Sequence, residues 1–256
     1  MSTPSSPLAI IVLAAGKGTR MKSDLPKVLH PLAGKPMIWH VLTAAHAMNP
    51  TRTVVITGHG AEAVEAAIAV DFPTVQFARQ TEQKGTGHAV QQASAALNGF
   101  TCTILILCGD VPLMQPAALQ AFVAQHHARG NAISVASAVV SDPTGLGRML
   151  RDNTGKLLTI REQKDCTEAE RAITECNTGI YAVSAAALWP TLAKLQPNNV
   201  QHELYLTDII PLGLAAGLPV DALTIPQDAG ELGGVNTPEQ LAASERIYLN
   251  RKAQAA

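Results

Sequence analysis

The stretch LAAGKGTRM, residues 13–21, places two glycines and two cations directly after an apolar run. A strand that ends in a glycine-rich turn and opens a helix points free backbone N–H groups at an anion, and the helix dipole adds to the attraction. Arg20 offers a fork of donors that suits phosphate oxygens, and Lys27 adds a compact point charge. The segment therefore predicts a polyphosphate site, with both cations exposed before substrate binds.

Two familiar phosphate loops do not fit this turn. A Walker A loop reads G-x-x-x-x-G-K-[ST], and Met21 stands where its second glycine belongs. The dinucleotide pattern G-x-G-x-x-G fails at the same position, because Gly16 and Gly18 are again followed by Met21. Glycine-rich turns between strands and helices also serve as purely structural features of α/β folds, so the glycines alone leave both interpretations open.

Asp110 and the histidines are further candidates for chemistry. Asp110 follows the apolar run TILILC, at the carboxyl end of an expected strand, where ligands bind in open α/β sheets. Taken alone, it could equally cap the turn that follows. The histidines form no H-E-x-x-H pattern; His126 and His127 are expected at the surface of a helix, and His88 is expected to orient a neighbour or lie in the core.

The elements that must position these residues follow from the hydrophobic pattern. Short β-branched runs alternate with alanine-rich segments through the first half of the chain, which predicts βαβ units and a parallel sheet covered on both faces. Runs as continuously apolar as 103–108 are typical of strands buried on both faces. The expected strands are 8–15, 53–58, 74–78, 103–108 and 132–140, and the expected helices are 36–48, 61–70, 86–97 and 116–129.

After residue 140 the pattern changes. Residues 148–160 favour two short strands around an Asn/Gly turn, residues 178–184 another strand, and residues 185–195 a helix. One more strand is expected at 220–226. Thr237, Pro238 and Gln240 then form a helix start, with an N-cap, a proline at the first position and a glutamine three residues after the cap.

Composition excludes several classes of protein. The chain has 256 residues, 47% of them hydrophobic, and 19 Lys plus Arg against 20 Asp plus Glu, which argues against a broad basic face for nucleic acid or anionic lipid. No window approaches the roughly 18 apolar residues that a spanning helix needs. The four cysteines form no C-x-x-C pair, so reduced thiols and a cytoplasmic location are expected, with no membrane and no nucleic-acid partner.

A resemblance to a known protein family makes the functional prediction more specific. Residues 13–37 resemble the opening of sugar-1-phosphate nucleotidylyltransferases, most of all the N-acetylglucosamine-1-phosphate uridylyltransferases that form the N-terminal domain of bifunctional bacterial enzymes. Further matching motifs follow in order across nearly the whole chain: QTEQKGTGHAV (80–90), GDVPL (109–113), DPTGLGR (142–148), REQKD (161–165), ECNTGIY (175–181), YLTDII (205–210) and GVNTPEQL (234–241). The resemblance implies an α/β fold with a Rossmann-like mixed, mainly parallel sheet and helices on both faces.

The resemblance also implies a set of site residues. Arg20 and Lys27 would contact the phosphates, and Asp110 with Asn236 would hold Mg²⁺, for which hard oxygen ligands are suitable. The nucleotide would lie against Leu13, Ala14, Ala15, Gly16, Gln80, Gln83, Gly85 and Thr86. The sugar would lie against Gly147, Glu162, Asn177 and Asn236. Cys108 departs from the resembled pattern, in which an aromatic residue often precedes Gly-Asp.

The activity implied by the resemblance is transfer of a uridylyl group from UTP to N-acetylglucosamine 1-phosphate, giving UDP-N-acetylglucosamine and pyrophosphate for cell-envelope precursor synthesis. Arg20, Lys27 and Asp110 would be the catalytic residues and Mg²⁺ the cofactor. Two alternatives stay open: a transferase for another sugar phosphate or nucleotide, and a nucleotide-binding module without catalysis.

The expected domain organisation follows from the same comparison. Residues 1–7 are expected to be a disordered leader, 8–236 the nucleotidylyltransferase domain, and 237–256 a C-terminal helix that starts a linker. Many proteins of this family continue into a left-handed β-helix that acetylates glucosamine 1-phosphate, and no such domain is expected within this chain. The oligomeric state is left open.

Overall fold

A computed structural model describes residues 7–254, so the expected leader lies, apart from Pro7, outside the described residues. The central strands are ordered β11-β7-β10-β6-β1-β4-β5, and β10 runs antiparallel to both its neighbours while β1, β4, β5 and β6 are mutually parallel. This confirms the mixed, mainly parallel sheet. The bounds are β1 Leu8–Ala14, β4 Arg52–Thr57, β5 Gln76–Arg79, β6 Thr103–Cys108, β7 Ile133–Val139, β10 Glu175–Ser184 and β11 Val220–Thr224.

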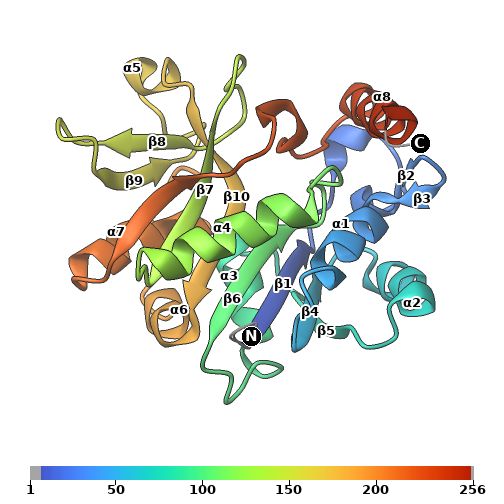
Figure 1. The fold of residues 1–256 in the computed structure, drawn as a ribbon, viewed down its shortest axis with the longest axis horizontal. Coiled ribbons are helices and arrows are strands. Elements are labelled where there is room, and N and C mark those ends of the chain that lie inside the picture. Colours follow the sequence, from blue (N-terminus) through green and yellow to red (C-terminus); the bar gives the residue numbers. More distant parts are fainter. Residues whose placement is uncertain (1–6, 255–256) are drawn as a thin grey trace.

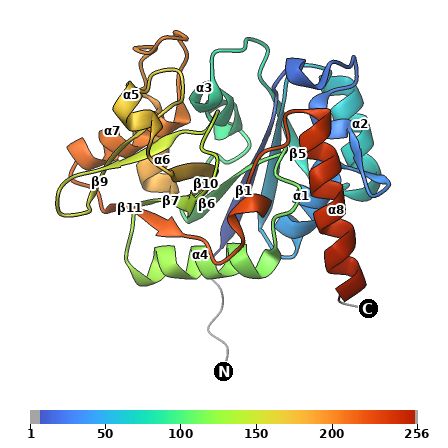
Figure 2. The ribbon, with the colours of Figure 1, turned by 90° about the horizontal axis from the view of Figure 1, so that it is seen from above.

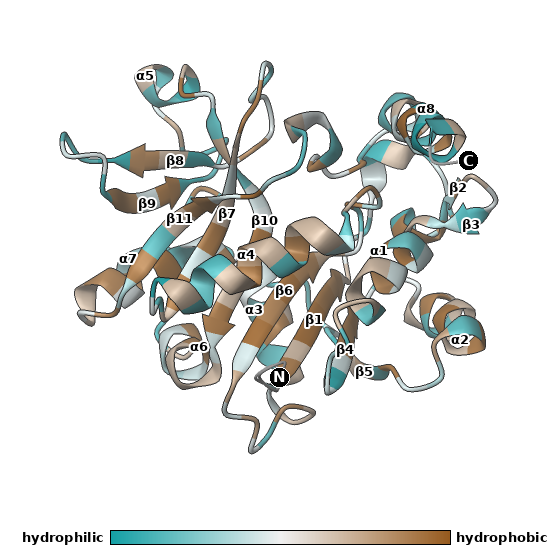
Figure 3. Ribbon diagram, viewed as in Figure 1, coloured by the Kyte–Doolittle hydropathy of each residue, from teal (hydrophilic) through white to brown (hydrophobic). Residues whose placement is uncertain are grey.

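Helices cover both faces of this sheet (Figure 1). Ile10 and Val12 of β1 point into one apolar core with α1 Met37–His46, α2 Ala61–Asp71 and α4 Pro116–Ala128. Ile11 points into the other core with α3 Thr86–Gln91, α6 Ala185–Leu192 and α7 Ile209–Ala215. Because both faces are buried, β1 is apolar throughout and β6 is apolar after Thr103 (Figure 3).

A hairpin extends the sheet beside β10. Strands β8 Arg148–Arg151 and β9 Leu157–Arg161 are antiparallel, as predicted, and Arg148 of β8 pairs with Cys176 of β10. Asp152 Oδ1 accepts hydrogen bonds from the backbone N–H groups of Thr154 and Lys156, at 2.8 and 3.0 Å, which closes the turn. The short helix α5 Glu168–Arg171 follows and starts at a capping box on Thr167.

The last helix, α8 Pro238–Gln254, starts where the sequence predicts. Gln240 N donates to Thr237 Oγ1 at 3.3 Å, and Thr237 N donates to Gln240 Oε1 at 3.2 Å. The helix contacts the small hairpin of β2 Pro31–Leu32 and β3 Lys35–Pro36, where Ala33 N donates to Glu245 Oε1 at 2.7 Å. Figure 2 shows α8 beside α1, at the side of the molecule away from β9.

One expectation about α3 and one about α4 are wrong. Helix α3 ends at Gln91 rather than near 97 and continues as a 3₁₀ turn at Gln92–Ser94, because the side-chain amide of Gln92 donates to the His88 carbonyl at 3.0 Å in place of the backbone N–H. His126 is buried, not at the surface, because its side of α4 faces β7 and its Nδ1 lies 2.9 Å from Ser134 Oγ. Within residues 7–254, no helix has the length and apolar character needed to cross a bilayer.

Candidate active site

A cleft of about 260 Å³ opens at the carboxyl ends of β1 and β6. This is the edge of an open α/β sheet at which ligands bind. All eight residues predicted to contact the nucleotide line it, together with Lys27 and Asp110. The remaining lining residues are Val28, Ala89, Cys108 and Glu203.

The glycine loop after β1 differs from the expectation in one respect. It is followed by a 3₁₀ turn at Thr19–Met21 rather than an α-helix, with Gly18 and Lys22 both in the left-handed region at φ 62° and 51°. The turn closes early because Met21 is buried, and its N–H donates to Gly18 O at 2.9 Å. A turn this short has almost no macrodipole, so attraction for an anion at this loop comes from backbone N–H groups and the nearby cations.

The Lys27 side chain bridges the two predicted metal ligands, Asp110 and Asn236. Its Nζ forms an ion pair with Asp110 Oδ2 and donates a hydrogen bond of 3.0 Å to Asn236 Oδ1. Asp110 and Asn236, from distant parts of the chain, therefore place one oxygen each around a single cation. The Lys27 side chain is only 14% exposed, so the expectation that it is exposed is wrong: the pair with Asp110 draws it into the cleft.

Local hydrogen bonds orient Asn236 toward this point. Its Nδ2 donates to Gly234 O at 3.0 Å, which leaves Oδ1 facing Lys27. Its backbone N–H donates to Gln240 Oε1 at 2.8 Å, so the first turn of α8 holds the residue in place. The capping glutamine that predicts the helix start thus also fixes a predicted metal ligand.

The end of the cleft that is predicted to hold the base is built around Gln80. This residue is 4% exposed, and its Nε2 lies 3.0 Å from both Gly85 O and His88 Nδ1. His88 therefore orients a neighbour, as predicted. Gln83 Nε2 donates to Ala15 O at 2.9 Å, which ties this wall to the end of β1. With both side-chain NH₂ groups engaged, each glutamine has its carbonyl oxygen available as an acceptor.

A backbone strap closes the same end. Leu204 N donates to Lys84 O and Gly87 N donates to Leu204 O, both at 2.8 Å, and Leu206 N donates to Thr86 Oγ1 at 3.0 Å. A Cβ on Gly85, whose φ is 103°, would lie 2.6 Å from Leu204 O. The glycine is therefore needed for the close approach of the two segments.

Arg20 lies beside the cleft rather than in it. Its side chain is exposed, as predicted, and it lines a neighbouring hollow of about 520 Å³ together with Asn236 and Gly234. Asn236 stands between the two spaces, because it also contacts Lys27. A molecule that extends past Lys27 would reach Arg20 next.

Three of the four predicted sugar residues gather on the β8–β10 side, whereas the fourth, Asn236, lies at Lys27. Asn177 N donates to Gly147 O at 2.8 Å, and a Cβ on Gly147 would lie 3.4 Å from Glu162 Oε1. Asn177 Nδ2 donates to Tyr181 Oη at 3.0 Å, and its Oδ1 accepts from Gly179 N at 2.9 Å. Burial, followed by the nearby Asp165, raises the pKa of Glu162. These three residues therefore form one cluster, next to the cleft rather than in its lining.

Cys108 and Glu203 contribute to the cleft although the sequence did not select them as ligands. Burial, followed by Asp110, raises the pKa of the Cys108 thiol to about 12, so it is neutral at physiological pH. Cys108 Sγ lies 3.5 Å from Gly179 O, which connects the cleft wall to the turn after Asn177. Glu203 precedes the motif YLTDII by two residues, and this motif was the signal that could have identified it.

The donor set around Lys27 fits a divalent cation that is completed by substrate. The described residues contain no group of three or more His, Cys, Asp or Glu side chains suited to a metal ion. One carboxylate and one amide oxygen are few, but Mg²⁺ is usually held by one or two carboxylates together with waters and substrate phosphates. The oxygens of Asp110 and Asn236 already converge on one cation, which is the geometry such a site requires.

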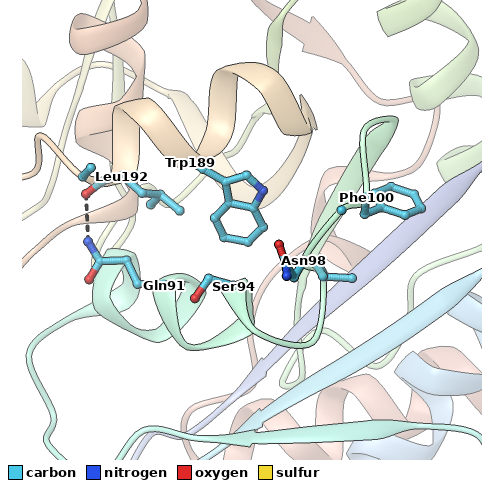
Figure 4. Close-up of a pocket in the computed structure, with 9 residues that line it drawn as sticks. Gln91, Ser94, Asn98, Phe100, Trp189 and Leu192 are labelled. Atoms are coloured by element: carbon cyan, nitrogen blue, oxygen red, sulfur yellow. Dashed lines mark hydrogen bonds between the residues drawn. The ribbon is translucent and has the colours of Figure 1, made fainter.

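A second pocket lies at the other end of the sheet. It has a volume of about 460 Å³ near the amino end of β6 and is lined by Trp189 and Phe100 among others. Gln91 Nε2 donates to Leu192 O at 2.7 Å, at one side of this pocket (Figure 4). Its lining contains none of the predicted site residues.

Comparison with known proteins identifies the family. Residues 10–199 match the MobA-like NTP transferase domain. The chain is 48% identical over 240 residues to the bifunctional protein GlmU of Kineococcus radiotolerans, covering 93% of this chain and 48% of that protein. It is 47% identical over 250 residues to the GlmU of Bordetella parapertussis, covering 96% and 54%. The chain thus spans about half the length of these curated relatives.

A solved structure supports the fold. The crystal structure of UDP-glucose pyrophosphorylase complexed with UDP-glucose has a TM-score of 0.77 and 17% sequence identity, and the match covers 96% of this chain and 100% of that one. At this identity the likeness shows the fold alone. The sequence matches confirm the resemblance that the motifs indicated, and the chain belongs to the family of MobA-like NTP transferase domains.

Proposed function

We propose that this protein transfers a uridylyl group from UTP to N-acetylglucosamine 1-phosphate, releasing pyrophosphate. The observation that carries the proposal is the convergence of Lys27, Asp110 and Asn236 at a cleft lined by all eight predicted nucleotide contacts. The similarity to GlmU proteins supports it. A module that only bound nucleotides would not need an acid and an amide around a cation.

Uracil fits the base end of the cleft by its hydrogen-bonding pattern. Uracil presents two carbonyl acceptors on either side of one N–H. Gln80 has its NH₂ group engaged with Gly85 and His88, so Gln80 Oε1 is available to accept from that N–H. Cytosine carries a lone pair at the same ring position and would leave a buried acceptor facing an acceptor, which is costly.

Asp110 Oδ2 and Asn236 Oδ1 would hold the Mg²⁺ ion. When bound, the ion would neutralise charge on the triphosphate and the leaving pyrophosphate. Lys27 and Arg20 would bind phosphate oxygens, Lys27 from inside the cleft and Arg20 from the neighbouring hollow. Two cationic side chains and the bound ion would thus lie along the path of a polyphosphate.

The chemistry needs no general base from the protein. The second pKa of a phosphate monoester is near 6, so the attacking oxygen of the sugar phosphate is already largely deprotonated at neutral pH. It would attack the α-phosphorus in line, forming one P–O bond while the bond to pyrophosphate breaks. Cys108 is no nucleophile here, because its raised pKa keeps the thiol neutral. Catalysis therefore rests on positioning two polyanions and neutralising their charge.

The sugar would lie on the side of Glu162, Gly147 and Asn177. The Glu162 carboxyl can accept from sugar hydroxyls, and Gly147 lets the backbone approach the N-acetyl group. Asn177 is held at both ends of its amide by Gly179 and Tyr181, so it would offer a fixed rather than an adaptable contact. These roles rest on the resemblance and on the position of the cluster beside Cys108.

The test is pyrophosphate release over a panel of nucleoside triphosphates and sugar 1-phosphates, with and without Mg²⁺, with the nucleotide sugar identified by mass. We expect the highest kcat/KM for UTP with N-acetylglucosamine 1-phosphate and no turnover without a divalent ion. A higher kcat/KM for another pair of substrates would overturn the proposed substrates but not the proposed class of enzyme, a nucleotidylyltransferase. Binding of UTP without turnover on any sugar phosphate would contradict the proposal.

A further inference from the structure

Lys27 lies where a divalent ion shared by Asp110 and Asn236 would have to lie. Its ammonium pairs with Asp110 Oδ2 and donates to Asn236 Oδ1 at 3.0 Å, the two oxygens that are proposed to hold the metal. Two cations this close together repel strongly in a partly buried site. A metal ion can therefore take both oxygens only when the ammonium has moved.

We propose that Lys27 is a built-in competitor of the divalent cation. The protein alone binds the metal weakly, and the triphosphate of the nucleotide draws the ammonium away from Asp110 and Asn236, so the metal is taken up together with the nucleotide. The inference rests on the proposed metal role of these two residues. The inference adds that Lys27 pairs with Asp110 before the nucleotide binds and with the phosphates afterwards.

The stem of Lys27 is fixed while its end can move. A Cβ on Gly18 would overlap Lys27 Cβ, so the loop backbone lies directly against the start of the side chain. Lys27 also begins a 3₁₀ turn, Lys27–Leu29, behind Pro26. The ammonium, in contrast, ends a flexible chain of methylene groups and has three donors that can be rearranged. The backbone and Cβ of Lys27 are thus held in place, while its ammonium group can move.

The alternative anion site is within the same cleft. Lys27 lines the cleft together with Gly16, Ala15 and Leu13, the residues at which the triphosphate would bind. The ammonium therefore needs to move only within the cleft to exchange a carboxylate for phosphate oxygens. Arg20 lines the neighbouring hollow and is not the residue paired with Asp110.

The test is Mn²⁺ binding without nucleotide, with free Mn²⁺ followed by electron paramagnetic resonance. We expect Lys27→Met to bind one Mn²⁺ at least about tenfold more tightly than wild type, because a competing charge is removed. The gain should vanish in Lys27→Met combined with Asp110→Asn. Lys35→Met is the matched control: it removes a lysine that pairs with Asp71 at 3.0 Å on the surface, and we expect wild-type Mn²⁺ affinity.

Equal Mn²⁺ affinity in wild type and Lys27→Met would overturn the proposal, as would a gain that survives Asp110→Asn or one matched by Lys35→Met. Circular dichroism checks the fold of each variant, and Lys27→Gln takes the place of Lys27→Met if that variant does not fold. No substrate is present in this titration. The outcome of the Mn²⁺ titration is therefore independent of the outcome of the turnover assay. An active enzyme can show no gain in Mn²⁺ affinity in Lys27→Met, and a chain without turnover can show this gain.

Discussion

The backbone N–H of Val235 donates a hydrogen bond of 2.8 Å to the backbone carbonyl of Asp110. This contact joins the segment before α8 to the end of β6 and so brings Asn236 to the same cation as the Asp110 carboxylate. Gly234, one residue earlier, lies so close that a Cβ there would be 3.2 Å from Asp110 Oδ2. The position of the carboxylate thus depends on two adjacent backbone positions.

Replacing Gly234 by alanine should displace the Asp110 carboxylate. A contact of 3.2 Å is tight, so the carboxylate must shift by a few tenths of an ångström, and we expect turnover to fall by about tenfold because catalysis depends on position. Gly233→Ala is the matched control, since a Cβ there meets no atom within 4 Å. Steady-state kinetics with both variants measures the effect. Similar activity in the two would contradict it.

Removing the Asp110 carboxylate should remove the proposed metal site. We expect Asp110→Asn to lower turnover by about 10² or more at saturating Mg²⁺. Asp71→Asn is the control, because Asp71 is also paired with a lysine but lies on the surface. Near-normal Mg²⁺-dependent turnover of Asp110→Asn would disprove the metal role.

Preference for uracil should depend on His88, although His88 is not among the cleft-lining residues. His88 Nδ1 lies 3.0 Å from Gln80 Nε2 and engages the NH₂ group, which leaves the Gln80 carbonyl to accept from the proposed base. With His88→Ala the amide can turn, and we expect the ratio of kcat/KM for UTP over CTP to fall by about tenfold. Gln91→Ala, on the same helix but hydrogen-bonded to Leu192 in the other pocket, should keep the ratio. An unchanged ratio in His88→Ala would show that Gln80 is held by other contacts.

Stability should fall in mild acid because of His126. Burial, helped by His127, lowers the pKa of His126 from 6.5 to about 4, so the unfolded chain takes up a proton between these pH values that the folded protein does not. The contribution of His126 to the free energy of unfolding should therefore be complete above pH 6.5. It should decrease as the pH falls toward 4, by up to about 3 kcal/mol. Burial raises the pKa of Glu162 and Asp208, which acts in the opposite direction.

Urea unfolding between pH 7.5 and 5 isolates the contribution of His126. The slope of unfolding free energy against pH should be smaller in His126→Gln than in wild type. His59→Gln, at an exposed histidine that is not among the groups shifting the pKa of His126, should keep the wild-type slope. Parallel slopes for wild type and His126→Gln would rule out a buried neutral histidine.

Much of the framework could be predicted because local patterns encode it. The alternation of apolar strands and helices predicts the sheet, and the position of Asp110 after the apolar run of β6 predicts its place at the ligand-binding edge. The caps Thr237 and Gln240 mark the start of α8 because capping is a local interaction.

The rest depends on contacts between distant segments. Lys27 and Asn236 are 209 positions apart, and nothing in the local pattern around either residue encodes their hydrogen bond. The burial of His126 rather than His127 is set by the side of α4 that meets β7. The 3₁₀ turn after the glycine loop likewise follows from the burial of Met21. Tertiary packing, not local preference, decides these features.

The most direct test of the account is a crystal structure with UTP and Mn²⁺, in which anomalous scattering locates the metal. The account predicts one Mn²⁺ peak coordinated by Asp110, Asn236 and triphosphate oxygens, with the Lys27 ammonium moved onto the phosphates. A peak that touches neither Asp110 nor Asn236, or a Lys27 ammonium still paired with Asp110 while UTP is bound, would contradict it.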